Sequence, residues 1–147
     1  MRNTWIALAA TAALALAAPS FAQSPVGVWK TIDDATGKPK SLVRISESGG
    51  QYSGKIEKLF RPAGEDQNPK CDKCTDARKD QPIIGMTILS GLKADGDEYT
   101  GGEIVDPNNG KTYKAKLKVE DGGKKLNMRG YIGMPMLGRT QTWLREE

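Results

Sequence analysis

The fold of this chain is decided by one stretch, Thr112-Tyr113-Lys114-Ala115-Lys116-Leu117-Lys118-Val119-Glu120. Apolar side chains occupy its odd-numbered positions from Tyr113 to Val119, and charged side chains occupy the even-numbered positions from Lys114 to Glu120. Successive side chains of a β-strand point to opposite faces. This period of two therefore predicts a strand with one face in the core and the other in water.

Turn signals lie on both sides of this strand. Asn109-Gly110 precedes it and readily adopts the positive φ angles of a hairpin, while Asp121-Gly122-Gly123 follows it. The neighbouring segments 99–106 and 124–132 are therefore predicted as strands that pair antiparallel with it. The second of these places Leu126, Met128 and Ile132 on the inner face.

The rest of the chain repeats this rhythm of short segments and turns. The expected strands are residues 26–32, 40–46, 51–60, 83–92, 99–106, 112–120, 124–132 and 139–145. Segment 83–92 also fits a short helix, but its β-branched residues and glycines favour a strand. About eight strands with mostly hairpin-length connections predict an all-β fold, a single small antiparallel barrel closed so that no sheet edge is exposed. A β-sandwich is the alternative.

The first residues have the pattern of a secretory signal peptide. Arg2 gives a positive start, an apolar run extends from Trp5 to Ala18, and Ser20-Phe21-Ala22 offers small residues to signal peptidase. The run is shorter than the roughly 20 residues that a membrane-spanning helix needs. We expect cleavage after Ala22, one domain at residues 23–147, and a periplasmic or secreted protein with no integral membrane segment.

Composition excludes several classes of function. The net charge of +4 is mild and its charges are interspersed, which disfavours nucleic acid as a partner. The sequence has no histidine, which excludes Ser-His-Asp and Cys-His nucleophiles and histidine metal ligands. Thr75 stands where a haem attachment motif would need histidine. We therefore predict no catalytic residue, no metal, no cofactor and no enzymatic activity.

Residues 61–82 are predicted as a long polar loop, of a length that is usually functional or mobile. Cys71 and Cys74 lie within it, and in an oxidising compartment they are predicted to form a disulfide. So tight a ring contributes about 2 kcal/mol by chain entropy and would stiffen the loop rather than hold the barrel. A redox pair and half of a metal site are the alternatives. The nearby Asp72, Asp76 and Asp80 would raise a thiol pKa and so disfavour the redox role.

The last predicted strand carries Arg139, Gln141, Trp143 and Arg145 on one face. If Trp143 points inward, Arg139 and Gln141 do so as well, and a buried arginine needs a partner. Arg139 and Gln141 could orient the head group of an apolar ligand, or Arg139 could clasp the barrel by stacking on Trp29. Glu103 is a further possible partner of Arg139. The candidate cavity residues are Trp29, Tyr113, Met128, Arg139, Gln141 and Trp143.

The segment before that strand contains Met134, Met136 and Leu137. We expect these side chains to pack in the core. The alternative is an exposed apolar rim that adapts to ligands or partners.

Several sequence blocks are spread along the chain: Gly27-Val28-Trp29, Thr36-Gly37-Lys38-Pro39, Cys71-Asp72-Lys73-Cys74, Gln81-Pro82-Ile83-Ile84-Gly85-Met86, Gly101-Gly102-Glu103-Ile104-Val105-Asp106-Pro107, Gly110-Lys111-Thr112-Tyr113, Arg129-Gly130-Tyr131 and Gly138-Arg139-Thr140-Gln141-Thr142-Trp143. Together they resemble one family of exported bacterial proteins, known as domain of unknown function 2147, over residues from about Val26 to Arg145. The resemblance implies a lipocalin-like fold and small apolar ligands, with no established enzymatic activity. It also implies a first-strand Trp29 covered by Arg139 or Arg145.

The leading expectation is thus an exported, non-enzymatic binding module for a small apolar or amphipathic ligand. A protein-protein interaction module of the cell envelope, acting through the 61–82 loop, and a redox role of Cys71 and Cys74 are the alternatives. The protein partner, if one exists, is not indicated by the sequence.

Overall fold

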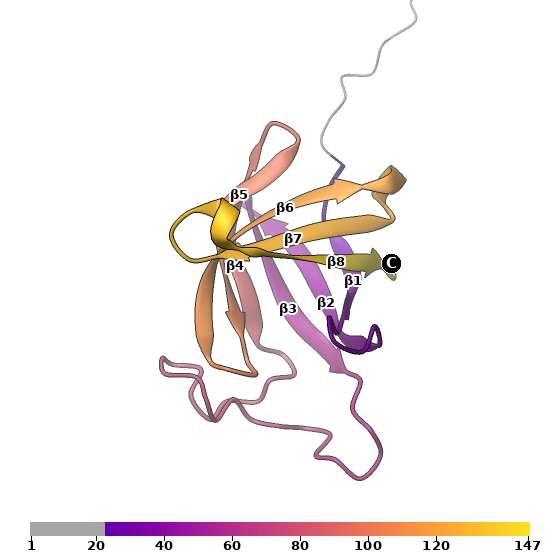
Figure 1. The fold of residues 1–147 in the computed structure, drawn as a ribbon, viewed down its shortest axis with the longest axis vertical. Helices are drawn as coiled ribbons and strands as arrows, with labels where there is room; N and C mark the ends of the chain where they lie inside the picture. Colours follow the sequence, from indigo (N-terminus) through magenta and orange to yellow (C-terminus); the bar gives the residue numbers. More distant parts are fainter. Residues whose placement is uncertain (1–22) are drawn as a thin grey trace, which may run out of the picture.

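The computed structural model describes residues 23–147, and the predicted signal peptide at residues 1–22 lies outside the described residues. The described part folds into one closed antiparallel barrel (Figure 1). Its eight strands are β1 (Gly27–Ile32), β2 (Pro39–Ser48), β3 (Gln51–Leu59), β4 (Thr87–Asp95), β5 (Glu98–Asp106), β6 (Lys111–Glu120), β7 (Lys125–Tyr131) and β8 (Arg139–Arg145). The all-β barrel predicted from the sequence is confirmed.

Each strand pairs with the next along the chain, and β1 closes the barrel against β8 through Trp29 opposite Arg145 and Lys30 opposite Leu144. In such an up-and-down order, alternate connections share one end of the barrel. The β1–β2, β3–β4, β5–β6 and β7–β8 connections therefore meet at one end, here called the open end. The other three connections lie at the opposite end, here called the closed end, together with Pro25 before β1 and Glu147 after β8. The long β3–β4 connection hangs below the strands in Figure 1.

The alternation in β6 is realised as predicted. Ala115, Leu117 and Val119 are buried, and the lysines between them lie on the outer face. Across the sheet, Leu117 faces Met128 of β7. Leu126 of the same strand faces Trp143 of β8. Because the pleat repeats on every strand, the inward residues converge on one core inside the barrel.

Most strands differ from their predicted bounds by one or two residues, and the largest difference is in β4. Strand β4 begins at Thr87 instead of residue 83 and continues to Asp95, beyond the predicted end. Gly85 has a φ of +91°. Its N–H donates to the carbonyl of Ile56, and the N–H of Ile56 donates to the carbonyl of Met86. This turn sets Ile83 and the residues up to Met86 outside the regular ladder.

The closed end is sealed by a tryptophan and an arginine. Trp29 is fully buried, and its indole N–H donates to the carbonyl of Pro25 at 2.7 Å. The guanidinium of Arg145 lies 4.3 Å from the centre of the Trp29 ring. The same guanidinium donates to the carbonyls of Gly123, Val26 and Ser24. Of the two arginines considered, Arg145 covers the tryptophan, and stacking by Arg139 is wrong.

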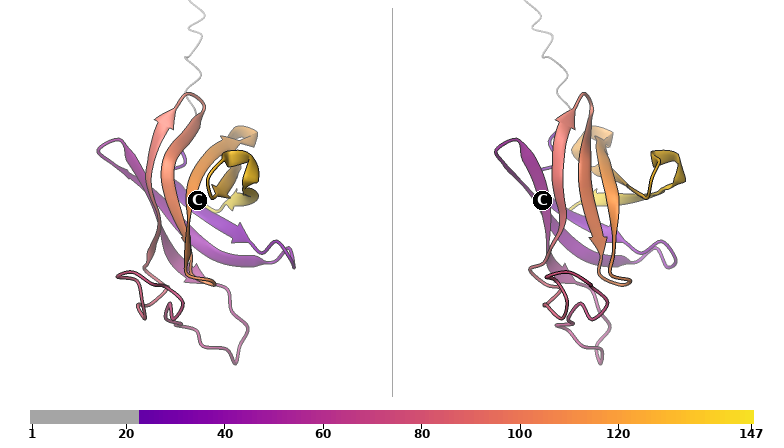
Figure 2. Two further views of the ribbon diagram at one scale, coloured as in Figure 1. Left: turned by 60° about the vertical axis from the view of Figure 1, so that its left-hand side comes forward. Right: turned by 90° about the vertical axis from the view of Figure 1, so that its left-hand side faces the viewer.

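Two short 3-10 turns, Asp121–Gly123 and Pro135–Leu137, complete the structure. Within residues 23–147, none of the helical segments has the length and apolar character needed to cross a membrane. The second turn belongs to the β7–β8 connection, which stands away from the barrel wall in Figure 2.

A candidate ligand-binding cavity at the open end

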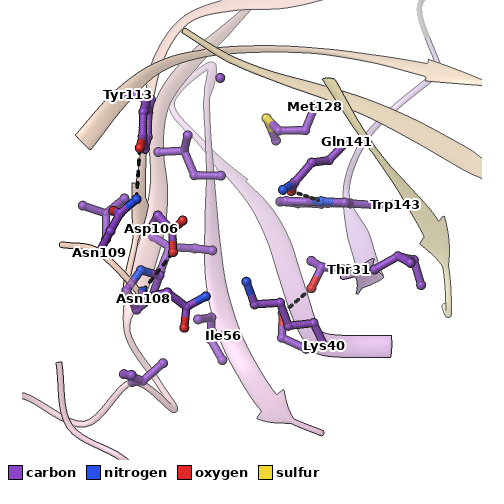
Figure 3. Close-up of a pocket in the computed structure, with 18 of the residues that line it drawn as sticks. Thr31, Lys40, Ile56, Asp106, Asn108, Asn109, Tyr113, Met128, Gln141 and Trp143 are labelled. Atoms are coloured by element: carbon purple, nitrogen blue, oxygen red, sulfur yellow. Dashed lines mark hydrogen bonds between the residues drawn. The ribbon is translucent and has the colours of Figure 1, made fainter. Parts of the chain in front are cut away.

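A cavity of about 490 Å³ opens at the open end of the barrel (Figure 3). Its lining comes from the strands and from three of the four connections at this end. The apolar lining residues include Ile56, Leu59, Phe60, Ile83, Ile88, Ile104, Val105, Tyr113, Met128, Ile132, Leu137 and Trp143.

Met128 and Trp143, both about 2% exposed, are the large buried side chains toward the core. In the close-up Gln141, which stands opposite Met128 in the β7–β8 ladder, lies between Met128 and the Trp143 ring (Figure 3). The indole N–H of Trp143 donates to the side-chain oxygen of Gln141 at 3.5 Å. An apolar group entering the cavity would therefore meet an aromatic face and a thioether, with one amide beside them.

Two hydroxyl groups lie in the same wall. Thr31 and Ser41, both buried, share a hydrogen bond of 2.6 Å between β1 and β2. Neighbouring Lys40 is exposed and also lines the cavity. Because the two hydroxyls satisfy each other, this polar spot adds little desolvation penalty to an apolar cavity.

The opposite wall carries polar groups at the β5–β6 turn. Asp106 accepts a hydrogen bond from the N–H of Asn108 at 2.9 Å. The side-chain amide of Asn109 donates to the Tyr113 hydroxyl at 3.1 Å. The cavity thus combines apolar walls with polar groups at its mouth, and this combination suits an amphipathic molecule.

Arg139 lies at the mouth with 79% of its side chain exposed. It donates to the Asp34 carboxylate at 2.6 Å, and Gln141 donates to the same oxygen at 3.3 Å. These bonds join β8 to the β1–β2 turn beyond the short β1–β8 ladder. Glu103 is exposed on β5, so its suggested pairing with Arg139 in the interior is wrong.

The β1–β2 turn that supplies Asp34 is itself held by a carboxylate. Asp33 accepts hydrogen bonds from the N–H groups of Thr36 at 2.9 Å and Ala35 at 2.8 Å. These bonds favour the charged carboxylate and hold the pKa of Asp33 below its usual range.

The structure brings together five of the six predicted cavity residues. Tyr113, Met128, Arg139, Gln141 and Trp143 all line the cavity. Trp29 lies apart from them, since it forms the seal at the closed end.

Other lining residues were missed. Ile56 and Ile88 lie on predicted strands, so their apolar character was an available signal. Lining residues from connections, such as Pro62 and Pro69, give no periodic signal because their placement depends on how the connections fold back over the barrel end.

The 61–82 loop forms part of this end of the molecule. Arg61, Pro62, Glu65 and Pro69 line the cavity. Cys71 and Cys74 form a disulfide, as predicted.

The disulfide is also more than a stiffener of the loop. Both cysteines are buried and belong to the main core cluster. The ring sits against the β5–β6 turn so closely that a Cβ on Gly110 would lie 1.8 Å from the carbonyl oxygen of Lys73. The expectation that the disulfide acts only within the loop is therefore wrong.

The prediction of core packing for the methionine-containing segment is wrong. Met134, Met136 and Leu137 are all more than half exposed. Arg129 holds this segment outward by donating to the carbonyl of Pro135 at 2.6 Å.

An eight-stranded antiparallel barrel, with a cavity at one end and a tryptophan–arginine seal at the other, defines a lipocalin-like protein. The chain belongs to the family of uncharacterised proteins conserved in bacteria called DUF2147, whose signature matches residues 27–145.

One solved structure with this fold is that of protein HP1028 from Helicobacter pylori, which is described as belonging to the lipocalin family. It shares 22% sequence identity with this chain, covers 84% of each chain, and superimposes with a TM-score of 0.71. At that identity the likeness concerns the fold. No curated protein sequence matches the chain significantly.

Proposed function

We propose that this protein is a non-enzymatic binding module for a small apolar or amphipathic molecule held in the open-end cavity. The observation that carries the proposal is the cavity of about 490 Å³ with its apolar walls. Sites for small molecules typically measure about 300–1,000 Å³ and combine apolar walls with a few polar groups. An eight-stranded barrel is also wide enough to enclose one such ligand.

The polar groups at the cavity favour binding over catalysis. Asp106 is engaged in holding its own turn, and the Thr31 and Ser41 hydroxyls bond to each other. The sequence offers no histidine to activate a nucleophile. The arrangement suits orientation of a ligand head group by Gln141 or Arg139.

The buried disulfide supports a structural role in preference to a redox role. Thiol exchange needs access to a sulfur atom, and Cys71 and Cys74 are 0% and 2% exposed. A disulfide also fits the predicted export to an oxidising compartment, where residues 1–22 would be removed.

The test is a variant whose added side chain occupies the cavity. Gly130 lines the cavity and lies two residues after Met128 on β7, so a side chain there would also point inward. A Cβ at Gly130 would have room, since its nearest atom would lie at 3.6 Å. We expect Gly130→Leu to fold but to lose at least about tenfold in affinity for laurate and for the neutral dye N-phenylnaphthylamine, since its side chain would occupy the ligand volume.

The matched control is Lys125→Leu, which adds the same side chain to an exposed position on the same strand. It should bind both probes as the wild type does. Native mass spectrometry of gently purified protein would add the stoichiometry. The proposal fails if the wild type binds neither probe and carries no small molecule, or if both variants bind equally well.

A further inference from the structure

The largest exposed apolar group in residues 23–147 lies on the β7–β8 connection. Seven large apolar side chains of the described residues are exposed, and four of them are Ile132, Met134, Met136 and Leu137, at 57% to 75% exposure. Residues 132–138 read Ile-Gly-Met-Pro-Met-Leu-Gly, with no polar side chain. Isolated exposed apolar residues are ordinary, but a contiguous group marks an interaction site. Residues 132–138 are called the apolar loop below.

The apolar loop is held in its outward position. Arg129 donates to the carbonyl of Pro135 and to the hydroxyl of Thr140, both at 2.6 Å. Gly138 approaches β7 so closely that a Cβ there would lie 2.4 Å from the carbonyl oxygen of Gly130. These contacts fix the base of the loop, so its apolar side chains are held in an exposed position.

The backbone of the loop tip forms two hydrogen bonds of its own. Leu137 N–H donates to the carbonyl of Met134 at 3.0 Å, and Gly138 N–H donates to that of Pro135 at 3.2 Å. Pro135 has no N–H to donate. A segment entering hydrocarbon must satisfy its polar backbone groups internally, and these bonds meet part of that requirement at the tip of the loop.

The shape of the loop and its connection to the cavity indicate what covers it. The loop projects from the barrel wall as a convex knob (Figure 2). Its residues Ile132 and Leu137 also line the cavity, as does the exposed Phe60. The apolar surface of the loop is thus continuous with the cavity wall. An apolar environment that covered the loop would therefore also lie against the mouth of the cavity.

We propose that the apolar loop docks the barrel on the surface of an anionic lipid bilayer, with Met134 and Met136 inserted among the acyl chains. The base of the loop has the residues that such a position favours. Tyr131 precedes it, Arg129 and Arg139 flank it, and Lys114 stands opposite Tyr131 on β6. Tyrosine and basic side chains are suited to the headgroup layer. Arg139 keeps most of its side chain exposed although it also pairs with Asp34.

The experiment measures co-sedimentation of the full protein with vesicles of phosphatidylglycerol and phosphatidylethanolamine. We expect the wild type to bind and Met134→Ser/Met136→Ser to lose about tenfold or more in partition coefficient, because two apolar side chains no longer enter the bilayer. Met136→Trp should bind more strongly, since tryptophan favours the interface. Circular dichroism and thermal unfolding would establish that each variant is folded.

The matched control is Leu144→Ser, which removes an exposed apolar side chain from the barrel wall of β8 and should leave vesicle binding unchanged. All variants share one N-terminus, so differences among them report the substituted residues. Equal binding by the wild type and Met134→Ser/Met136→Ser overturns the proposal. So does a wild type that does not bind vesicles, including the case in which the loop crosslinks to a protein instead.

This result is separable from that of the proposed function. Met134 and Met136 do not line the cavity, so Met134→Ser/Met136→Ser should bind laurate as the wild type does. Loss of vesicle binding with intact laurate binding supports the docking loop alone. If the wild type binds vesicles but binds neither laurate nor N-phenylnaphthylamine and carries no small molecule, only the cavity proposal is contradicted.

Discussion

At the scale of single residues, Arg145 has the largest set of partners at the closed end. It covers the Trp29 ring and donates to four backbone carbonyls, those of Ser24, Val26, Gly123 and Glu147, from three separate segments. Removing the guanidinium removes these hydrogen bonds and the cation–π contact. The seal is therefore a target for a direct test of stability.

We predict that Arg145→Met lowers the free energy of unfolding by about 2–4 kcal/mol, because hydrogen bonds to a charged donor are strong and several are lost together. Urea denaturation provides the measurement. Arg44→Met is the control, since Arg44 forms an exposed ion pair with Glu57 that should contribute little to stability. Equal losses in the two variants would contradict the importance assigned to the seal.

The Asp33 carboxylate predicts how the stability of the β1–β2 turn depends on pH. Its pKa is lowered in the folded protein, chiefly by the N–H of Thr36 and then by that of Ala35. A lowered pKa contributes stability that is fully present above the unfolded-state value of about 3.9 and is lost as pH falls through the folded value. NMR titration of the Asp33 carboxyl carbon should give a midpoint below that value, and the β1–β2 turn should loosen only in that acidic range. A midpoint at or above it would refute this description of the turn.

At the scale of elements, the 61–82 loop depends on one close approach. The Lys73 carbonyl lies against Gly110, which has a φ of +73° in the β5–β6 turn. A side chain at this position meets both an unfavourable backbone conformation and an occupied space. Gly49 has a similar φ of +60° in the β2–β3 turn, with nothing within 4 Å of its Cβ position.

Comparing alanine substitutions at Gly49 and Gly110 separates the effect of the positive φ from that of the contact with the 61–82 loop. Gly49→Ala should cost about 1–2 kcal/mol from its positive φ, and Gly110→Ala should cost a further ~1–3 kcal/mol because the loop must shift. Thermal unfolding compares the two variants, and laurate binding shows whether a displaced loop disturbs the cavity. If both substitutions cost the same, the 61–82 loop is not clamped by the turn.

Elements with a regular pattern could be predicted from the sequence, and the others could not. The alternation from Tyr113 to Val119 fixes which face is inward, and the structure follows it. By contrast, the start of β4 depends on the turn at Gly85, and the outward position of Met134 and Met136 depends on bonds from Arg129. Such contacts join residues across a fold that must already exist, so hydropathy alone assigned the methionines to the core.

At the scale of the whole molecule, the two ends of the barrel have different roles. At the closed end Trp29 and Arg145 stack on each other and hydrogen-bond to the backbone. The open end contains the cavity and carries the apolar loop. Five of the six candidate cavity residues could be predicted because inward positions on late strands share a face. Trp29 could not be separated from them, since the strand pattern gives the face of a residue but not its depth along the barrel axis.

The most direct test of the central claim records the indole N–H resonances of Trp143 and Trp29 by NMR while laurate is added. Trp143 lines the cavity, and Trp29 lies at the closed end with its N–H bonded to Pro25. If the cavity binds the ligand, the Trp143 resonance and the side-chain amide of Gln141 shift in a saturable manner while Trp29 stays nearly unchanged. Unperturbed Trp143 and Gln141 signals at high laurate concentration, or equal shifts at both tryptophans, would contradict the account.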